Sequence, residues 1–158
     1  MNWSNPSLAP FVPTPITVVR EMLTLADVKP GEKVYDLGCG DGRILVVAAQ
    51  EFGAEAVGVE LNMERVKEGR DRISALGLNE KVKIVYGNIF DVDVSPADVV
   101  TLYLTTSGNE KLRPKLDKEL RGGARIISHD FTVPGWKIHR VERVPEDYRV
   151  HTLYLYLR

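Results

Sequence analysis

Short apolar runs alternate with helix-like runs along most of the chain, and this alternation constrains the fold more than any other feature of the sequence. Each apolar run has the length of a strand, and residues 97–104 are almost continuously apolar, which is typical of a strand buried on both faces. Strands separated by helices predict a parallel sheet with helices packed on its faces. The expected strands are residues 33–37, 54–61, 82–86, 97–104 and 124–128.

Four helices are expected. The helical spacing of apolar residues predicts the first two, and residues typical of helix starts and ends predict the other two. The first is expected to use Thr14 as its N-cap, with Pro15 at the first helical position. In the last, Pro114 suits the first helical turn, where its missing N–H costs no hydrogen bond. The expected helices are residues 15–27, 43–52, 62–76 and 114–120.

The two ends of the chain depart from this alternation. Three prolines keep residues 1–13 from forming one regular element, so an extended arm is expected there. Residues 137–144 and 149–157 alternate apolar and polar side chains around Pro145-Glu146-Asp147, which predicts an antiparallel hairpin. The expected fold is a single α/β domain over residues 1–158, with a Rossmann-like, doubly wound and mostly parallel sheet that ends in this hairpin.

Composition limits the class of function and the cellular compartment. The chain has 158 residues, 44% of them hydrophobic, and a net charge of −1, so it offers no global attraction to nucleic acid or to an anionic membrane. It shows neither a signal peptide nor an apolar run long enough to span a membrane, and we expect a cytoplasmic protein. Its single cysteine and single glutamine are compatible with a thermophilic source.

A glycine-rich turn follows the first expected strand, in the segment Val34–Arg43, which reads VYDLGCGDGR. Its spacing matches neither the G-x-G-x-x-G turn of dinucleotide-binding folds nor the P-loop. The acidic residues around the glycines disfavour a phosphate and favour a cationic ligand, although aspartate is also common in turns for local reasons. The ligand contacts expected in this turn are Asp36, Gly38, Gly40 and Asp41.

S-adenosylmethionine fits such a site, because it carries a sulfonium and an ammonium group and no phosphate. Glu60 stands at the end of the second expected strand, where an acid can accept hydrogen bonds from both ribose hydroxyls. Asn88 follows the third strand, where it can bond the adenine amine, with two apolar residues beside the ring. The further cofactor contacts expected are Glu60, Leu61, Asn88, Ile89 and Phe90.

With these motifs the sequence resembles the class I, seven-strand, S-adenosylmethionine-dependent methyltransferases. It is most similar to the small archaeal protein-lysine methyltransferases of broad specificity, and more distantly to eukaryotic lysine methyltransferases of mitochondrial proteins. The subfamily likeness depends on a proline-containing arm, a Ser-His-Asp-Phe segment with a Gly-Trp pair, and the end of the chain. These segments are Phe11–Pro15 (FVPTP), Ser128–Phe131 (SHDF), Gly135-Trp136 and His151–Tyr156 (HTLYLY).

The resemblance implies methyl transfer to the ε-amine of lysines on the surface of protein substrates. It also implies an arm that folds over the cofactor, with contacts from Phe11, Pro13 and Thr14. The fourth strand ends in Leu102–Thr105 (LYLT) instead of the Asn/Asp-Pro-Pro-Tyr/Phe motif of methyltransferases that act on planar amines, which argues against adenine-N6 or glutamine-amide methylation.

Four residues stand where a lysine site would form. Tyr103 and His129 are candidate catalytic residues, since a histidine can relay a proton near neutral pH. Tyr103, Phe131 and Trp136 are candidate substrate contacts, because aromatic faces stabilise cations. Each also has a purely structural interpretation: a buried strand tyrosine, a hydrogen-bonded core histidine, or a tryptophan that covers the sheet edge. His151 is expected to be structural, and no metal site is expected.

Two other functions remain open. An RNA methyltransferase on the same fold would need a basic face with exposed aromatic residues, and the sequence offers only a mild excess of positive charge after residue 107. The other is a non-catalytic binding module that kept the cofactor pocket, and the intact glycine turn and Glu60 argue against it. We therefore expect a monomeric protein-lysine methyltransferase that acts on protein partners and not on nucleic acid or membranes.

Overall fold

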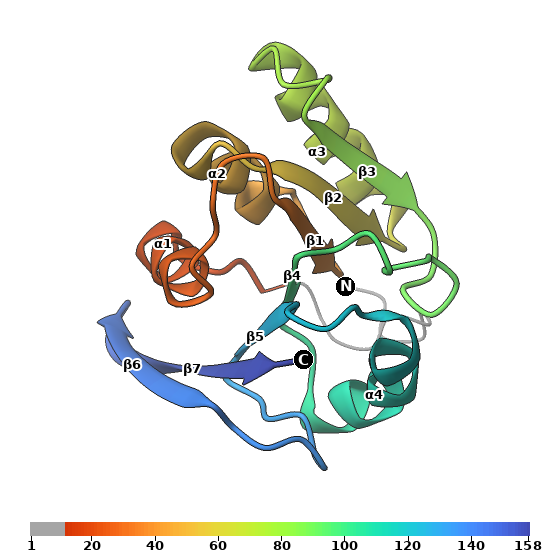
Figure 1. The fold of residues 1–158 in the computed structure, drawn as a ribbon. Helices are drawn as coiled ribbons and strands as arrows, with labels where there is room; N and C mark the ends of the chain where they lie inside the picture. Colours follow the sequence, from red (N-terminus) through yellow and green to blue (C-terminus); the bar gives the residue numbers. More distant parts are fainter. Residues whose placement is uncertain (1–11) are drawn as a thin grey trace.

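One seven-stranded sheet with helices on both faces organises the molecule (Figure 1). This computed structural model describes residues 12–158, and Phe11 with the rest of the arm before Val12 lies outside the described residues. The strands are β1 Lys33–Leu37, β2 Glu55–Glu60, β3 Val82–Tyr86, β4 Val99–Leu102, β5 Arg125–His129, β6 Arg140–Glu146 and β7 Arg149–Leu157. The helices are α1 Ile16–Leu25, α2 Arg43–Phe52, α3 Met63–Ala75 and α4 Thr106–Glu119.

The strand order is β3-β2-β1-β4-β5-β7-β6, with β7 antiparallel to both of its neighbours and every other pair parallel. The chain moves outward from β1 to β3 on one side and then returns to add β4 and β5 on the other. Strand order therefore reverses between β1 and β4, and in open parallel sheets the ligand site lies at the carboxyl end of the strands at such a point. The doubly wound fold expected from the sequence is confirmed.

Two hydrophobic cores cover the two faces of this sheet. Residues of α1, α2 and α3 pack on one face, around Val34 and Ala56 of the central strands. Residues of α4 and of the loop before β4 pack on the opposite face, around Leu37 and Leu102. Neighbouring residues of β1 and β4 contribute to opposite cores. Strand β4 is buried along its whole length, which fits the almost continuously apolar sequence around it, and β1 is buried from Val34 to Leu37.

The beginning of α1 differs from the expectation. The helix begins at Ile16 with Pro15 as its N-cap, and no side chain caps it. The Thr14 hydroxyl instead lies 3.3 Å from Nδ1 of His129, and the side chain is buried. Thr14 is therefore a tertiary contact between the segment before α1 and the end of β5.

The last helix is longer than expected. Helix α4 begins at Thr106, because the Thr105 hydroxyl caps it by accepting a hydrogen bond from the N–H of Gly108 at 3.0 Å. Pro114 lies inside the helix, and not in its first turn. Proline in a helix interior removes one hydrogen bond, and the burial of Leu112 and Leu116 in the second core offsets this loss.

The hairpin turn is also shorter than expected. Strand β6 includes Pro145 and Glu146, and the connection to β7 is the two-residue loop Asp147-Tyr148. Both loop residues have positive φ, 52° and 63°, as in the type I′ turns that join two-residue hairpins. Neither is a glycine or an asparagine, so the sequence indicated a turn at Pro145-Glu146-Asp147 but not its type or its exact position.

Candidate active site

The glycine turn after β1 is fixed to the end of β2 by backbone hydrogen bonds. The N–H groups of Gly38 and Cys39 donate to the carbonyl oxygen of Val59 at 2.8 and 3.0 Å. Gly38, Gly40 and Gly42 all have positive φ, which explains the alternating glycines. A Cβ at Gly38 would lie 3.3 Å from Leu104, so the turn closely approaches the segment that follows β4.

Asp36 lies beneath this turn and is almost completely buried. Its Oδ1 accepts a hydrogen bond from the Thr101 hydroxyl at 2.9 Å, a contact between β1 and β4. Burial raises the pKa of Asp36 to about 7, against the opposing effect of the Thr101 hydrogen bond, and the charges of Glu60 and Asp41 raise it further. A cationic ligand near this carboxyl group would favour its ionised form.

Glu60 joins the end of β2 to the glycine turn. One carboxylate oxygen accepts from the N–H of Gly40 at 2.8 Å and the other from the N–H of Asn62 at 2.9 Å. Each oxygen keeps a lone pair for a further donor, as ribose hydroxyl recognition requires. Leu61 follows directly and is half-buried.

Asp41 has a different environment from the one that its place in the motif suggested. Its carboxylate accepts from Arg43 Nη2 at 2.8 Å and lies 3.5 Å from Nη1 of Arg72. Burial opposes ionisation of Asp41, but the hydrogen bonds and charge of Arg43 lower its pKa overall. Its charge is thus compensated within the protein, and the cation of a ligand is not needed to explain it.

The residues around the turn fit S-adenosylmethionine better than a phosphate-bearing ligand. Arg43 is the basic residue next to the glycines, and its guanidinium is held by Asp41 and by the carbonyl oxygen of Thr14 at 3.1 Å. The carboxyl groups of Asp36 and Glu60 have no arginine or lysine hydrogen-bond partner among residues 12–158. This set of acceptors suits a ligand with an ammonium, a sulfonium and ribose hydroxyls.

The loop after β3 forms the third part of this region. Asn88 accepts a hydrogen bond from the N–H of Phe90 at 2.9 Å through its side-chain oxygen, which leaves its amide N–H₂ for another partner. Ile89 is buried in the second core, and Phe90 is half-buried against it. This loop therefore meets the carboxyl edge of the sheet beside β2, as the sequence predicted.

The candidate lysine site lies on the other side of β1, at the ends of β4 and β5. Tyr103 immediately follows β4, and its ring centroid lies 3.8 Å from that of His129 and 6.4 Å from that of Phe131. The Tyr103 hydroxyl donates to Oδ2 of Asp130 at 3.4 Å. Three of the four residues proposed for the lysine site, Tyr103, His129 and Phe131, therefore lie together, and Asp130 lies beside them.

His129 is fully buried between several polar partners. Its Nε2 lies 2.8 Å from Nδ1 of His151, and its Nδ1 contacts Thr14. Burial lowers the pKa of His129 to about 4, although the charge of Asp130 opposes this shift. The imidazole is therefore neutral at pH 7 and a weak base, which favours the structural interpretation over proton transfer.

Trp136 lies apart from this group. Its indole N–H donates to Oδ1 of Asp117 at 2.8 Å, and its ring packs at 5.5 Å from that of Tyr156. These contacts place it against α4 and β7, where it covers the second core. No contact of Trp136 with Tyr103 or Phe131 supports the substrate role considered for this tryptophan.

Sequence reasoning missed two residues of this region. Asp130 was part of the recognised SHDF segment but received no role of its own, and Arg149 carried no signal at all. Arg149 donates from Nη2 to Oδ2 of Asp130 at 2.7 Å and to the Tyr103 hydroxyl at 3.3 Å. Only the pairing of β7 with β5 brings these residues together.

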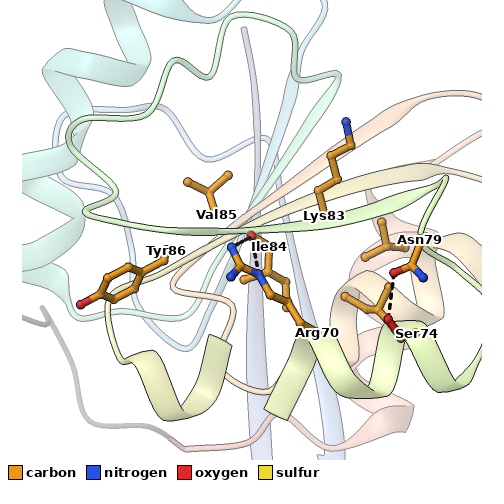
Figure 2. A pocket seen from close by; sticks show the side chains of 9 residues that line it. Arg70, Ser74, Asn79, Lys83, Ile84, Val85 and Tyr86 are labelled. Atoms are coloured by element: carbon orange, nitrogen blue, oxygen red, sulfur yellow. Dashed lines mark hydrogen bonds between the residues drawn. The ribbon is translucent and has the colours of Figure 1, made fainter. Parts of the chain in front are cut away.

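A hollow of about 620 Å³ lies along the outer edge of β3 (Figure 2). There Arg70 of α3 donates two hydrogen bonds to the carbonyl oxygen of Ile84, at 2.8 and 3.3 Å. The hollow shares no residue with either group described above. In residues 12–158 the helices also lack the length and apolar character of a membrane span.

Comparisons with known proteins agree on one class. A family model described as the ANTKMT methyltransferase domain matches residues 36–140. A protein-lysine N-methyltransferase from Saccharolobus islandicus is 50% identical over 149 residues, which cover 94% of this chain and 92% of that protein. The adenine nucleotide translocase lysine N-methyltransferase of Mus musculus is 34% identical over 128 residues, 81% of this chain, and the matched region is 56% of that relative.

One solved structure is also similar over almost its whole length. The crystal structure of an RNA methyltransferase from Salinibacter ruber in complex with S-adenosyl-L-homocysteine has a TM-score of 0.87 and 42% sequence identity. The superposition covers 92% of this chain and 93% of that one. The similar proteins from Saccharolobus islandicus and Salinibacter ruber therefore carry names that point to different substrates, protein lysine and RNA.

Proposed function

The chain belongs to the ANTKMT methyltransferase domain family and is a class I methyltransferase that uses S-adenosylmethionine, and from this premise we propose that it methylates the ε-amines of lysines in proteins. The observation that carries the proposal is the 50% identity to the archaeal protein-lysine N-methyltransferase over nearly the full length of both chains. The grouping of aromatic rings and a carboxylate at the ends of β4 and β5 supports it, since such a group suits a cationic side chain.

We assign the cofactor to the glycine turn and the loops beside it. Gly38 and Gly40 would let the ligand approach the backbone, Glu60 would accept from the ribose, and Asn88 would bond the adenine. Asp36 would face the charged methionine part. The further contacts in the proposal are Pro13, Thr14, Leu61, Ile89 and Phe90, while Asp41 is left out because arginines already compensate its charge.

When bound, S-adenosylmethionine supplies a methyl group on a positively charged sulfur. The lysine amine must reach it without a proton, and at pH 7 only about one free lysine in 2,500 is neutral. His129, the candidate base at this site, is a weak one, because burial lowers its pKa to about 4. We therefore assign to Tyr103 and Phe131 the holding of the lysine side chain, and to the solvent the acceptance of its proton.

The proposal also covers substrate specificity, oligomeric state and cellular location. With the substrate site at an exposed sheet edge, we propose broad specificity for surface lysines of protein partners. We also propose that the protein acts as a monomer in the cytoplasm of a thermophilic archaeon. Size measurement by light scattering tests the monomer directly, and a dimer at micromolar concentration would contradict it.

RNA methylation is the second candidate, and a specific observation favours it. The similar Salinibacter ruber structure carries the name of an RNA methyltransferase at 42% identity. Against it stand the net charge of −1 and the pairing of charges beside the glycine turn, since Arg43 and Arg72 are both held by Asp41. An RNA substrate would need free cations there.

Labelling with a methyl-labelled cofactor separates the two candidates. Equal portions of a protein mixture and of total RNA are incubated with the enzyme and then treated with protease or nuclease. The proposal predicts label that protease releases and nuclease does not. Glu60→Ala serves as the control, because the loss of a charged acceptor should weaken cofactor binding by about 1–3 kcal/mol and reduce labelling of any substrate. Label that only nuclease releases would replace the proposal by the second candidate.

A further inference from the structure

Arg149, at the start of β7, forms a close ion pair with Asp130, just after β5. Nη2 lies 2.7 Å from Oδ2 of Asp130, and Nη1 lies 3.2 Å from Oδ1, so both carboxylate oxygens are bound by the guanidinium. Nη2 also donates to the Tyr103 hydroxyl at 3.3 Å. A cation thus already occupies the space beside the tyrosine and the carboxylate at the candidate lysine site.

The two partners differ in how firmly the protein holds them. The Asp130 side chain is 18% exposed and is also fixed by the N–H of Thr152, which donates to Oδ1 at 3.1 Å. The Arg149 side chain is 45% exposed, and within residues 12–158 its guanidinium forms only one hydrogen bond outside this pair and Tyr103, to the carbonyl oxygen of Val150. The carboxylate is thus a fixed part of the site, whereas the guanidinium can leave without disturbing a packed core.

The backbone around the pair is strained in an unusual way. In the described part of the chain four non-glycine residues have positive φ, and three of them are Asp130, Asp147 and Tyr148. Such residues cost roughly 1–3 kcal/mol each and concentrate at functional sites. The Asp130 carboxylate contacts the Tyr103 hydroxyl. Asp147 and Tyr148 form the two-residue turn that precedes Arg149, the first residue of β7.

The register of the hairpin explains how Arg149 reaches this place. His129 pairs with Leu153, so the preceding residues Arg149–Thr152 continue beyond the carboxyl end of β5. Tyr148 and Val150, on either side of Arg149, are both exposed. The tip of the hairpin therefore projects over the edge of the sheet where substrate would approach, and Arg149 is attached to that projecting part.

The pair also lies close to the proposed cofactor turn. Tyr103 precedes Leu104, whose side chain would lie 3.3 Å from a Cβ at Gly38. Asp130 contacts Tyr103 directly. A cation held between Tyr103 and Asp130 would thus be separated from the glycine turn by the short segment that follows β4.

From these observations we propose that the carboxylate of Asp130, with the Tyr103 hydroxyl and ring beside it, is the subsite that captures the ammonium group of the substrate lysine, and that Arg149 occupies this subsite until the lysine replaces it. The inference rests on the proposed function and names the groups that recognise its substrate. Exchange of one cation for another keeps the carboxylate paired throughout, which avoids leaving a partly buried charge without compensation. A neutral side chain could not displace Arg149, so the exchange selects a cationic side chain such as that of lysine.

The test uses steady-state kinetics on a lysine peptide that the wild-type enzyme methylates. Arg149→Ala should lower KM for the peptide by about fivefold with little change in kcat, because an exposed ion pair no longer has to be broken. Asp130→Asn, in which asparagine also tolerates positive φ, should raise KM about tenfold or more while calorimetry finds unchanged affinity for S-adenosylhomocysteine. In the Asp130→Asn background, Arg149→Ala should no longer lower KM for the peptide. Arg143→Ala, an exposed arginine of the same hairpin, is the matched control and should match the wild type.

A measurement on the wild-type protein avoids any effect of substitution on folding. The NMR signals of the Arg149 guanidinium should change, and its N–H exchange should accelerate, when the peptide joins the complex with S-adenosylhomocysteine. A peptide with norleucine in place of the lysine should leave these signals unchanged. Unchanged signals with the lysine peptide, or a lower kcat with raised KM in Arg149→Ala, would show a permanent structural bridge and overturn the inference. If the wild-type enzyme methylates no lysine in any protein or peptide, the proposed function itself fails.

Discussion

Cofactor binding should release a proton from Asp36. The carboxyl group is buried between β1 and β4, and its pKa in the free protein is raised to about 7, chiefly by burial. A cofactor that brings a sulfonium and an ammonium close to this group favours the ionised form, so the bound state should hold Asp36 without its proton. Binding and deprotonation are then coupled.

The size of the effect follows from the pKa. At pH 7 a group with a pKa of about 7 is half protonated, so binding should release about 0.5 proton. Below pH 7 the free protein holds the proton ever more completely, and affinity should fall roughly tenfold for each pH unit. Above pH 8 Asp36 is ionised in both states and contributes no further pH dependence. The amino group of the ligand, with an ordinary pKa of about 8, adds a separate trend that is common to all variants.

Calorimetric titration with S-adenosylmethionine in two buffers of different ionisation enthalpy counts the protons. In Asp36→Asn the release near pH 7 and the loss of affinity between pH 7 and pH 5 should both disappear. Asp98→Asn is the matched control, since Asp98 accepts a hydrogen bond from the N–H of Lys33 at the opposite end of the same strands. Equal proton release in the wild type and in Asp36→Asn would refute the argument and remove Asp36 from the cofactor site.

Three further predictions concern the fold and the chemistry. Gly58→Ala should destabilise the protein by about 1–3 kcal/mol in urea denaturation, because the new Cβ would lie 2.5 Å from Sγ of Cys39 and 2.6 Å from Leu45. Gly87→Ala is the control, since the nearest atom to its new Cβ would lie at 3.9 Å. Equal stability of the two variants would contradict the reasoning. Tyr148→Gly should stabilise the protein by roughly 1 kcal/mol and raise Tm by about 2–4 °C, since glycine adopts positive φ freely and Tyr148 is fully exposed; a lower Tm would mean that the turn is not strained. His129→Gln should change kcat by no more than a few fold, because the buried imidazole is a weak base. The rate at subsaturating peptide should still rise about tenfold per pH unit through neutrality. A loss of kcat of about a hundredfold, with a flat pH profile, would assign the proton transfer to His129.

Local patterns in the sequence predicted the elements that form the cofactor region. Strand β1, helix α2 and strand β3 have the expected bounds, because each is directly followed in the sequence by a glycine, a local signal for the end of the element. The extent of α4 was not predicted, since Pro114 indicates a first turn more strongly than Thr105 indicates a cap at the start of the same stretch. The two local signals therefore predict different helix starts. In the folded protein, burial of the apolar face of α4 favours the longer helix.

Charge pairing was the part that the sequence did not reveal. Asp41 stands in a motif that suggested a ligand contact, yet Arg43 and Arg72 compensate it, and Arg72 is far away in sequence. The pair of Asp130 with Arg149 depends on the antiparallel register of β5 with β7, which no local pattern specifies. Side chains whose roles depend on partners in distant strands could be assigned only once the sheet order was known.

The most direct test of protein-lysine methylation locates the transferred group atom by atom. The enzyme is incubated with a protein mixture and a cofactor that carries a deuterated methyl group, and tandem mass spectrometry maps the label, with Glu60→Ala in parallel. The account predicts deuterated methyl on the Nζ of surface lysines of many proteins, strongly reduced in the variant. Label that is absent from every lysine and found instead on RNA nucleosides, with the same dependence on Glu60, would contradict it.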